Sequence, residues 1–175
     1  LKKKIENLNY STNIEIDYVL GDICDLSLLQ KVYNKNKINI FYHAAAYKHV
    51  ELLEKNYYSA IKNNLLSTLN TCEVAIKNKV EFFCLISSDK AVNPMSIMGM
   101  TKRYCEKILL NCNNTKTSKF FSVRFGNVIN SSGSVIPIFK NQIENKIPVT
   151  VTNKNVTRYF MHVEDAVALV LKSTL

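Results

Sequence analysis

The sequence predicts an α/β fold, in which a Rossmann-like parallel sheet carries helices on both faces. Short apolar segments alternate along the chain with segments whose apolar residues recur at helical intervals. This alternation favours parallel strands joined by right-handed crossovers. Some apolar segments end abruptly in polar residues, and open α/β sheets bind their ligands at such strand ends. The chain of 175 residues can bury one core, and no linker or repeat divides it.

Each element follows from the local pattern of apolar residues. Apolar residues run together or alternate in five segments, which we expect to be strands: residues 14–20, 38–46, 80–86, 120–125 and 149–152. They recur every three or four positions in four segments, which we expect to be helices: residues 26–33, 57–78, 96–110 and 162–173. Residues 1–9 are a helical remnant or a linker, and residues 131–145 a loop that leads into a helix. The last helix should be capped near Glu164 and Asp165.

Composition excludes several classes of protein. The chain is 47% hydrophobic and 21% charged, as globular domains are, and shows no signal peptide and no apolar stretch of membrane-spanning length. The formal charge is +9, but apart from Lys2-Lys3-Lys4 the lysines are scattered, whereas a nucleic-acid-binding patch is clustered. The positive field suits an anionic small molecule. We therefore expect a cytoplasmic protein with no nucleic-acid partner and no membrane contact within this segment.

The cysteines and histidines lack the spacing of disulfide frameworks and metal sites. The five cysteines are odd in number and form no C-x-x-C motif, which predicts free thiols in a reducing compartment. His43, His49 and His162 are not spaced as close metal ligands, so we expect no metal site.

Residues 85–103, LISSDKAVNPMSIMGMTKR, are the most informative segment. An apolar run turns polar at Ser87-Ser88-Asp89-Lys90, breaks at Asn93-Pro94 and resumes as a helix that contains Lys102. Hydroxyl, carboxylate and ammonium groups directly after a buried strand favour a site at the carboxyl end of that strand. A helix cap is the simpler interpretation, but a cap needs one such residue and here there are four.

Four segments together resemble a known family. HAAAYKHVELLEKN, SSDKAVNPMSIMGMTKR, VRFGNVINSSGSVIPIF and TRYFMHVEDA are similar, in this order, to the nucleotide-sugar 4,6-dehydratases of polysaccharide biosynthesis, a branch of the extended short-chain dehydrogenase/reductase family. The resemblance covers residues 20–175. It implies a tightly held NAD or NADP, a UDP-sugar substrate and a homo-oligomer for the full-length protein. Enzymes of this kind oxidise C4 of the sugar, eliminate water across C5–C6 and reduce C6.

The resemblance also implies that the beginning of the fold is missing. A dinucleotide-binding fold begins with a strand and a G-x-G-x-x-G turn, and the glycines at positions 21, 99, 126 and 133 do not have that spacing. The first residue is Leu1 rather than Met. We expect residues 1–175 to be an N-terminally truncated NAD(P)-binding domain without its first βαβ unit, in which residues 128–175 contribute to the substrate side. Activity of this fragment alone, and a membrane anchor upstream, stay open.

The resemblance implies catalytic roles for the residues after the central strand. Elimination needs an acid for the departing hydroxyl and a base for the C5 proton, and adjacent side chains can supply both if their pKa values are pushed apart. Asp89 is implied to be the acid and Lys90 the base, while Ser88 holds the C4 oxygen. Relatives more often have Thr at the position of Ser88, which keeps the hydroxyl. The alternative is an Asp89–Lys90 surface ion pair.

The position of Met98 is the main departure from the family. Short-chain dehydrogenases generally carry Tyr-x-x-x-Lys, in which the lysine holds the nicotinamide ribose and the tyrosine takes a proton. Lys102 is retained, but Met98 stands in place of the tyrosine, and a thioether cannot accept that proton. Either another group replaces the tyrosine, or the protein is an inactive relative. The retained Asp89 and Lys90 favour the first interpretation.

The resemblance places five further residues near the cofactor. Asp22 in GDICD would contact the adenine, Ala44, Ala45 and Ala46 would line the dinucleotide, and Asn64 would steady the active-site strands. The alternatives are a turn cap for Asp22, tight helix–sheet packing for the three alanines and a solvated helix position for Asn64.

On the substrate side the resemblance implies Lys48, His49, Asn127 and Arg158. Asn127 and Arg158 would bind the diphosphate, since a guanidinium forms a bidentate fork for anions. The alternatives are a turn for Asn127 and a salt bridge with Glu164 for Arg158.

The sequence therefore predicts an NAD(P)-dependent UDP-N-acetylglucosamine-type 4,6-dehydratase of surface polysaccharide or glycan biosynthesis. A nucleotide-sugar 4-epimerase is the nearest alternative, but it needs no acid–base pair at C5–C6. A non-catalytic basic binding module is the second alternative, favoured only by the scattered lysines and the missing tyrosine.

Overall fold

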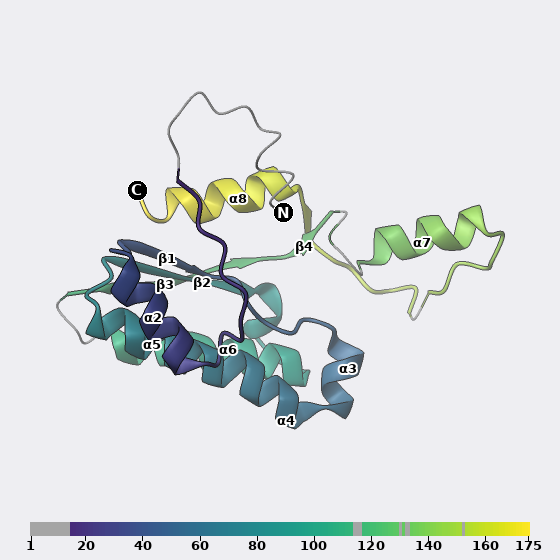
Figure 1. The fold of residues 1–175 in the computed structure, drawn as a ribbon. Helices are drawn as coiled ribbons and strands as arrows, with labels where there is room; N and C mark the ends of the chain where they lie inside the picture. Colours follow the sequence, from purple (N-terminus) through teal and green to yellow (C-terminus); the bar gives the residue numbers. More distant parts are fainter. Residues whose placement is uncertain (1–14, 114–116, 130, 132–133, 152) are drawn as a thin grey trace.

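The computed structural model describes residues 15–113, 117–129, 131, 134–151 and 153–175 (Figure 1). Its elements, in chain order, are α2 (Leu26–Lys35), β1 (Ile40–His43), α3 (Val50–Lys55), α4 (Tyr57–Ala60), the π-helix η1 (Ile61–Leu66), α5 (Ser67–Lys77), β2 (Phe82–Ser88), the 3-10 helix η2 (Asp89–Ala91), α6 (Ile97–Cys112), β3 (Lys119–Phe125), β4 (Asn127–Val128), α7 (Val135–Glu144), β5 (Phe160–Met161) and α8 (Val163–Lys172). The predicted segment 1–9 lies outside the described residues.

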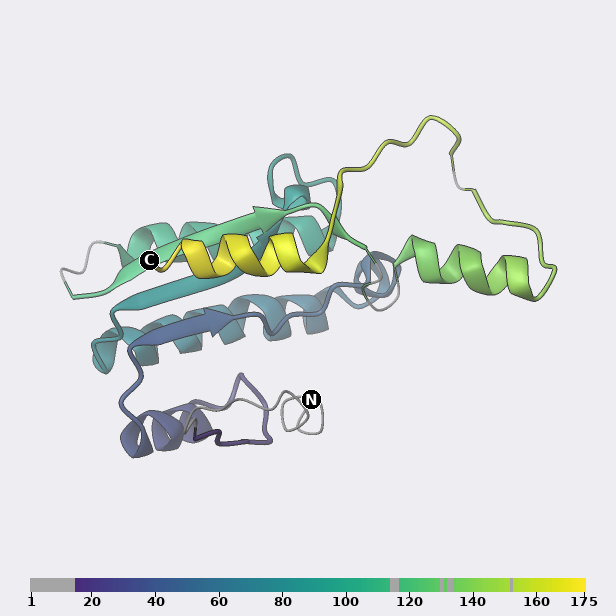
Figure 2. The same cartoon turned by 90° about the horizontal axis from the view of Figure 1, so that it is seen from above.

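A parallel sheet of order β1-β2-β3 forms the centre of the fold. Helices α2, α5 and α6 lie on one side of the sheet and α8 on the other, while α7 stands apart from it (Figures 1 and 2). This arrangement confirms the predicted α/β fold with helices on both faces. A second parallel pair, β4 with β5, continues from the carboxyl end of β3.

A row of aromatic rings crosses the sheet on the side of α5 and α6. Phe41, Phe83 and Phe120 occupy matching register positions on the three strands. The ring centroids of Phe41 and Phe83 are 5.1 Å apart and those of Phe83 and Phe120 are 5.2 Å apart. Cross-strand aromatic pairs of this kind stabilise a sheet beyond the area they bury. All five cysteines are free thiols, as predicted, and Cys72, Cys84 and Cys105 are buried.

Two predicted strands are wrong. Residues 15–20 have no regular structure, and position 14 is outside the described part. Hydrogen bonds from a neighbouring strand maintain a strand, and within the described residues β1 pairs only with β2. Residues 149–151 are also irregular, with position 152 outside the description. There the side chain of Gln142 on α7 bonds both the amide and the hydroxyl of Thr150, and the strand β5 forms ten residues later.

The predicted helix 57–78 is three elements, because the π-helix η1 separates α4 from α5. The short helix α3 was not predicted. The last helix begins after His162, whose side chain makes no capping bond, and Glu164 and Asp165 lie in its first turn. Within the described residues no helix has the length and apolarity needed to cross a membrane.

Candidate functional site

Three of the predicted catalytic residues form one hydrogen-bonded group where β2 ends. Ser88 caps the 3-10 helix η2 by accepting a bond from the Lys90 amide, and its hydroxyl donates to Asp89 Oδ1 over 2.9 Å. The ammonium of Lys90 donates to the same Asp89 oxygen over 3.0 Å. The tight 3-10 turn after the strand brings these side chains together, because it folds the chain back before α6 begins.

The group extends to the strand that follows β3. The Lys90 ammonium also donates to Asn127 Oδ1 over 3.2 Å, although the two residues are far apart in the sequence. Gly126 makes this junction possible, since a Cβ there would lie 2.6 Å from the carbonyl oxygen of Tyr159. The absence of a side chain at Gly126 therefore lets the segment before β5 approach the end of β3.

A cavity of about 310 Å³ opens beside this group. It is lined by Asp89, Lys90, Thr157, Arg158 and Tyr159. The Arg158 side chain is exposed and donates to the carbonyl of Thr157 over 2.7 Å. Among the described residues it makes no ion pair with Glu164, so the predicted salt-bridge alternative is wrong. A guanidinium and an ammonium thus line a single cavity together with a carboxylate.

The Asp89 carboxyl group is held ionised. Burial by itself would raise its pKa, but the hydrogen bonds from Lys90 and Ser88 lower the pKa below its usual value. The opposite charge of Lys90 acts in the same direction. At neutral pH Asp89 is therefore a carboxylate, and it accepts a hydrogen bond from Lys90 Nζ.

Helix α6 approaches this group closely. Its N-cap Ser96 accepts a bond from the Gly99 amide over 3.1 Å. A Cβ at Gly99 would lie 2.5 Å from the carbonyl oxygen of Lys90, so glycine is required for this approach. Lys102, one turn further along, is only 9% exposed, and its ammonium donates to the carbonyl of Ile86 over 2.8 Å. Burial lowers the pKa of Lys102, while Cys105 and Glu106 act against this.

Met98 lies in an apolar cluster. It is 5% exposed and packs with Leu53 and Ala60, so that it joins α6 to α3 and α4. In the described structure its contacts are those of a core residue. The hydroxyl nearest to it in the hydrogen-bond network is that of Thr101, which donates to the Met98 carbonyl over 2.8 Å. The hydroxyl of Ser88 is bonded to Asp89.

Asn64 ties the loop after β1 to α6. It is 1% exposed, which makes the solvated-helix alternative wrong. Its Oδ1 accepts from the Tyr47 amide over 2.8 Å, and its Nδ2 donates to the Tyr47 carbonyl over 3.1 Å and to Thr101 Oγ1 over 3.0 Å. The Asn64 carbonyl accepts from Thr68 and Cys105 side chains. Asn64 lies in the π-helix η1, which shifts the backbone hydrogen-bond register, and single π-helical turns of this kind are frequent at functional sites.

Two of the other predicted cofactor-side residues line one cavity. Asp22 and Ala45 both line a largely apolar cavity of about 340 Å³ between α2 and β1. Asp22 Oδ1 accepts from the Cys24 amide over 2.8 Å, as in a turn, while the residue stays exposed. Ala44 is exposed and Ala46 half-buried in the same loop.

The predicted substrate-side residues do not all come together. Asn127 and Arg158 lie at the cavity or at the group beside it, as described above. Lys48 and His49 are exposed, and His49 lines a separate, mostly apolar cavity of about 250 Å³ with Tyr47 and Leu52. They are not among the residues lining the Arg158 cavity.

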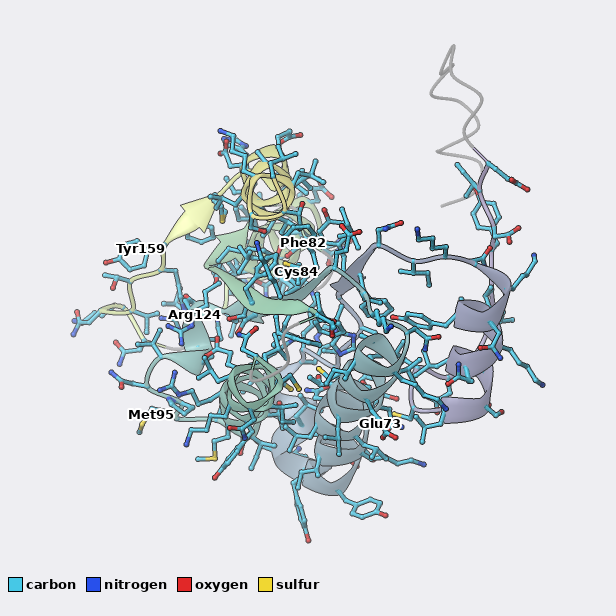
Figure 3. All side chains as sticks on the ribbon, turned by 90° about the vertical axis from the view of Figure 1, so that its left-hand side faces the viewer. Glu73, Phe82, Cys84, Met95, Arg124 and Tyr159 are labelled. Atoms are coloured by element: carbon cyan, nitrogen blue, oxygen red, sulfur yellow. The ribbon has the colours of Figure 1, made fainter. Side chains whose placement is uncertain are left out.

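Sequence reasoning missed an ion pair behind the site, between the buried Glu106 and the partly exposed Arg124. Glu106 on α6 is 5% exposed and accepts two bonds from Arg124 at the end of β3. Figure 3 shows Arg124 and Tyr159 near one edge of the molecule, with Glu73 of α5 well away from them. The available signal was the spacing of Glu106 four residues after Lys102, which places both on one face of the helix.

Comparisons with known proteins show the family of this chain. The family model described as polysaccharide biosynthesis protein matches residues 1–175. The chain is 50% identical over 166 residues to the capsular polysaccharide biosynthesis protein CapD of Staphylococcus aureus, covering 94% of this chain and 28% of that protein.

Two further relatives carry names of specific enzymes. The chain is 35% identical over 174 residues to a UDP-glucose 4-epimerase of Rickettsia rickettsii, covering 97% of this chain and 50% of that protein. It is 34% identical over 160 residues to the UDP-N-acetylglucosamine 4,6-dehydratase (inverting) of Campylobacter jejuni, covering 89% of this chain and 47% of that protein.

A solved structure shares the fold. The X-ray structure of Pen from Bacillus thuringiensis matches with a TM-score of 0.88 at 32% identity, covering 98% of this chain and 53% of that one. This chain thus spans about half, or less, of the length of these proteins. The family model covers the chain from its first residue to its last and confirms the resemblance predicted from the four motifs. The chain belongs to the polysaccharide biosynthesis protein family, a branch of the extended short-chain dehydrogenases/reductases.

Proposed function

We propose that this chain is the catalytic part of an NAD(P)-dependent UDP-N-acetylglucosamine 4,6-dehydratase that serves surface polysaccharide or glycan biosynthesis. The observation that carries the proposal is the Ser88–Asp89–Lys90–Asn127 group beside the cavity lined by Arg158. An acid–base pair and a phosphate-binding guanidinium at one cavity suit elimination from a nucleotide diphosphate-sugar. The Campylobacter jejuni relative carries the name of this activity.

The cofactor side of the proposal rests on Lys102 and on the cavity of Asp22 and Ala45. An ammonium has three N–H donors, and the one that bonds Ile86 leaves two for the hydroxyls of a ribose. The small side chains of Ala44 and Ala45 allow a dinucleotide to approach the backbone closely. When bound, the nicotinamide supplies the hydride acceptor for oxidation at C4 and the donor for reduction at C6. NAD and NADP both fit this proposal.

The Asp89–Lys90 pair is proposed to supply both the acid and the base of elimination. The roles implied by resemblance, Asp89 as acid and Lys90 as base, need a neutral carboxyl group and a neutral amine. The free protein instead holds Asp89 as a carboxylate that accepts a hydrogen bond from Lys90 Nζ. A proton must therefore pass from Lys90 to Asp89 along their 3.0 Å hydrogen bond before those roles apply. Removal of the C5 proton by Lys90 is then assisted by the C4 ketone, because the ketone acidifies that proton.

Substrate binding is proposed to use Arg158 and Asn127 for the diphosphate and Ser88 for the C4 oxygen. The position of Arg158 in the cavity supports a substrate-side role for residues 128–175. Met98 takes no part in proton transfer, since it lies in the apolar cluster with Leu53 and Ala60. Lys48 and His49 line or adjoin a different cavity, and we do not assign them to the sugar.

The test is mass spectrometry of UDP-N-acetylglucosamine incubated with the full-length protein and NAD(P)⁺. We expect a product that has lost one water. Asp89→Asn and Lys90→Ala should abolish this loss, whereas the exposed controls Asp165→Asn on α8 and Lys107→Ala on α6 should keep it.

Two outcomes would contradict the proposal. Conversion to an isomer of unchanged mass would make the protein a 4-epimerase, the activity named for the Rickettsia rickettsii relative. Unchanged substrate from a folded protein that binds NAD(P)⁺ would contradict both the dehydratase and the 4-epimerase activity.

A further inference from the structure

We propose that Glu106 is a positioning residue, which fixes the relative placement of the Ser88–Asp89–Lys90 turn, Asn127 and Lys102. This inference rests on the proposed function for its kinetic part. Glu106 does not line the cavity beside Asp89, so it acts through the elements that it holds rather than on substrate.

One carboxylate holds three elements together. Ser87 Oγ donates to Glu106 Oε1 over 2.6 Å. Arg124 donates to both carboxylate oxygens, through Nε to Oε1 over 2.7 Å and through Nη2 to Oε2 over 2.6 Å. Arg103 adds a longer contact of 3.4 Å from the same helix. A bidentate guanidinium–carboxylate pair fixes orientation as well as distance.

The three elements are those that carry the proposed site. Ser87 and Arg124 are register partners at the ends of β2 and β3. Ser87 precedes Ser88 directly, and Arg124 lies three residues before Asn127. Glu106 lies one turn after Lys102 on α6. A shift of Glu106 therefore moves the strand-end turn, the diphosphate residue and the buried lysine relative to one another.

Stability alone gives a poor account of this arrangement. The Glu106 side chain is 6% exposed but that of Arg124 is 39% exposed, and an ion pair that reaches solvent typically contributes little to stability. Positioning, in contrast, is sensitive to small displacements, since a shift of about 1 Å can slow a reaction by about 100-fold.

The chain offers a matched control at the opposite end of the same two elements. Asn113, which follows α6, donates through Nδ2 to the Phe120 carbonyl over 2.6 Å and accepts from the Phe120 amide over 2.7 Å. It also joins α6 to β3, but at the amino end of the strand, away from the site. Loss of this link should lower stability without displacing the site residues.

The experiment compares Glu106→Gln with Asn113→Ala in the full-length protein. Glutamine keeps the shape of the side chain but offers one acceptor and one donor where two acceptors are needed. We expect Glu106→Gln to lower kcat for water loss about 10- to 100-fold with KM changed by less than about twofold. Asn113→Ala should keep kcat within about twofold, even if it lowers Tm by as much as Glu106→Gln does. Equal loss of kcat in both variants would overturn the proposal.

A second readout does not depend on activity. Backbone amide hydrogen exchange of residues 86–90 and 124–128 should accelerate in Glu106→Gln and stay unchanged in Asn113→Ala. If the unaltered protein fails to release water, the dehydratase proposal fails, whereas this exchange still tests the positioning role. Unchanged exchange in Glu106→Gln would overturn it. If Glu106→Gln does not fold, Ser87→Ala, which removes one of the bonds, replaces it with the same expectations.

Discussion

Lys102 is the least typical side chain of the site, because an ammonium group is seldom as little exposed as 9%. Its one hydrogen bond to the Ile86 carbonyl leaves most of its donors unused by the described protein. A buried cation lowers stability unless it is fully paired. The position is explained if a bound ligand completes the pairing.

We therefore expect Lys102→Met to weaken NAD(P)⁺ binding at least about tenfold without lowering the free energy of unfolding. Methionine has a similar length and needs no partner in the buried position. Isothermal titration calorimetry and urea denaturation measure the two quantities. Lys107→Met, an exposed position on the same helix, serves as the control, and unchanged affinity in Lys102→Met would exclude the ribose role.

Met98 is expected to matter for stability, because its side chain fills the cluster with Leu53 and Ala60. Met98→Ala should lower the free energy of unfolding by about 2–5 kcal/mol, as truncation of a buried side chain does. Met100→Ala, at an exposed position on the same helix, should change it by less than about 0.5 kcal/mol. Urea denaturation gives both values. Equal effects would mean that Met98 is not a core residue.

At the scale of elements, the π-helix η1 is the feature that organises the loop after β1. It places Asn64 where its amide can bond both backbone groups of Tyr47 and the hydroxyl of Thr101. All the polar atoms of this buried side chain are thereby satisfied, which the buried position demands. The loop with Tyr47 is consequently fixed relative to α6.

Asn64→Asp is expected to lower the free energy of unfolding by at least about 2 kcal/mol. A carboxylate cannot donate to the Tyr47 carbonyl or to Thr101 Oγ1, and a polar atom at this buried position that is left unpaired costs about 1–3 kcal/mol, or more if it is charged. The neighbouring Asn63→Asp is the control and should have a small effect. Thermal and urea denaturation would test the difference. An unchanged free energy of unfolding in Asn64→Asp would contradict the role of Asn64 in fixing the loop with Tyr47 to α6.

The strands and helices of ordinary geometry could be predicted from sequence, whereas the π-helix η1 and the irregular segment 15–20 could not. Strands β2 and β3 and helix α6 follow from apolar runs and helical spacing, and their predicted bounds differ by a few residues. The π-turn was missed because Ile61, Leu65 and Leu66 also fit an ordinary helix. Residues 15–20 have strand-like residues, but strand formation depends on a neighbour that local sequence does not reveal.

For the site, the motif 87–90 could be predicted because chemistry and strand end coincide in one short segment. The contacts of Asn127 and Arg158 depend on the close approach at Gly126, which is a tertiary effect. The pairing of Glu106 with Arg124 could not be predicted, because the spacing from Lys102 places Glu106 on a helix face but does not identify its partner on β3. The roles of all these residues stay predictions until variants are assayed.

The molecule as a whole should lose stability in acid through two carboxyl groups. The pKa of Glu106 lies below its ordinary value of 4.5, because bonds from Arg124 and Ser87 outweigh the burial that would raise it. Asp89 is likewise shifted below 3.8, where bonds from Lys90 and Ser88 outweigh burial. A lowered pKa in the folded state contributes stability that is complete above the unfolded value and is lost as the pH falls through the folded value.

We therefore expect the free energy of unfolding to be flat near neutral pH and to fall below about pH 4.5. Glu106→Gln should reduce this dependence, because the amide does not titrate, while the exposed control Glu73→Gln should keep it. Denaturation at several pH values measures the slopes. An identical acid slope in Glu106→Gln would show that other groups dominate.

The parallel sheet also has a consequence for how the chain folds. β2 pairs on both sides with distant segments, Ile40 with Phe82 and Phe82 with Lys119, so no hairpin can start the sheet. Each pairing must first close a long crossover that contains a helix, and such non-local contacts make folding slow. The three strands and the helices between them must therefore be present before β2 is covered, and until then its apolar edge remains open to pairing with other chains.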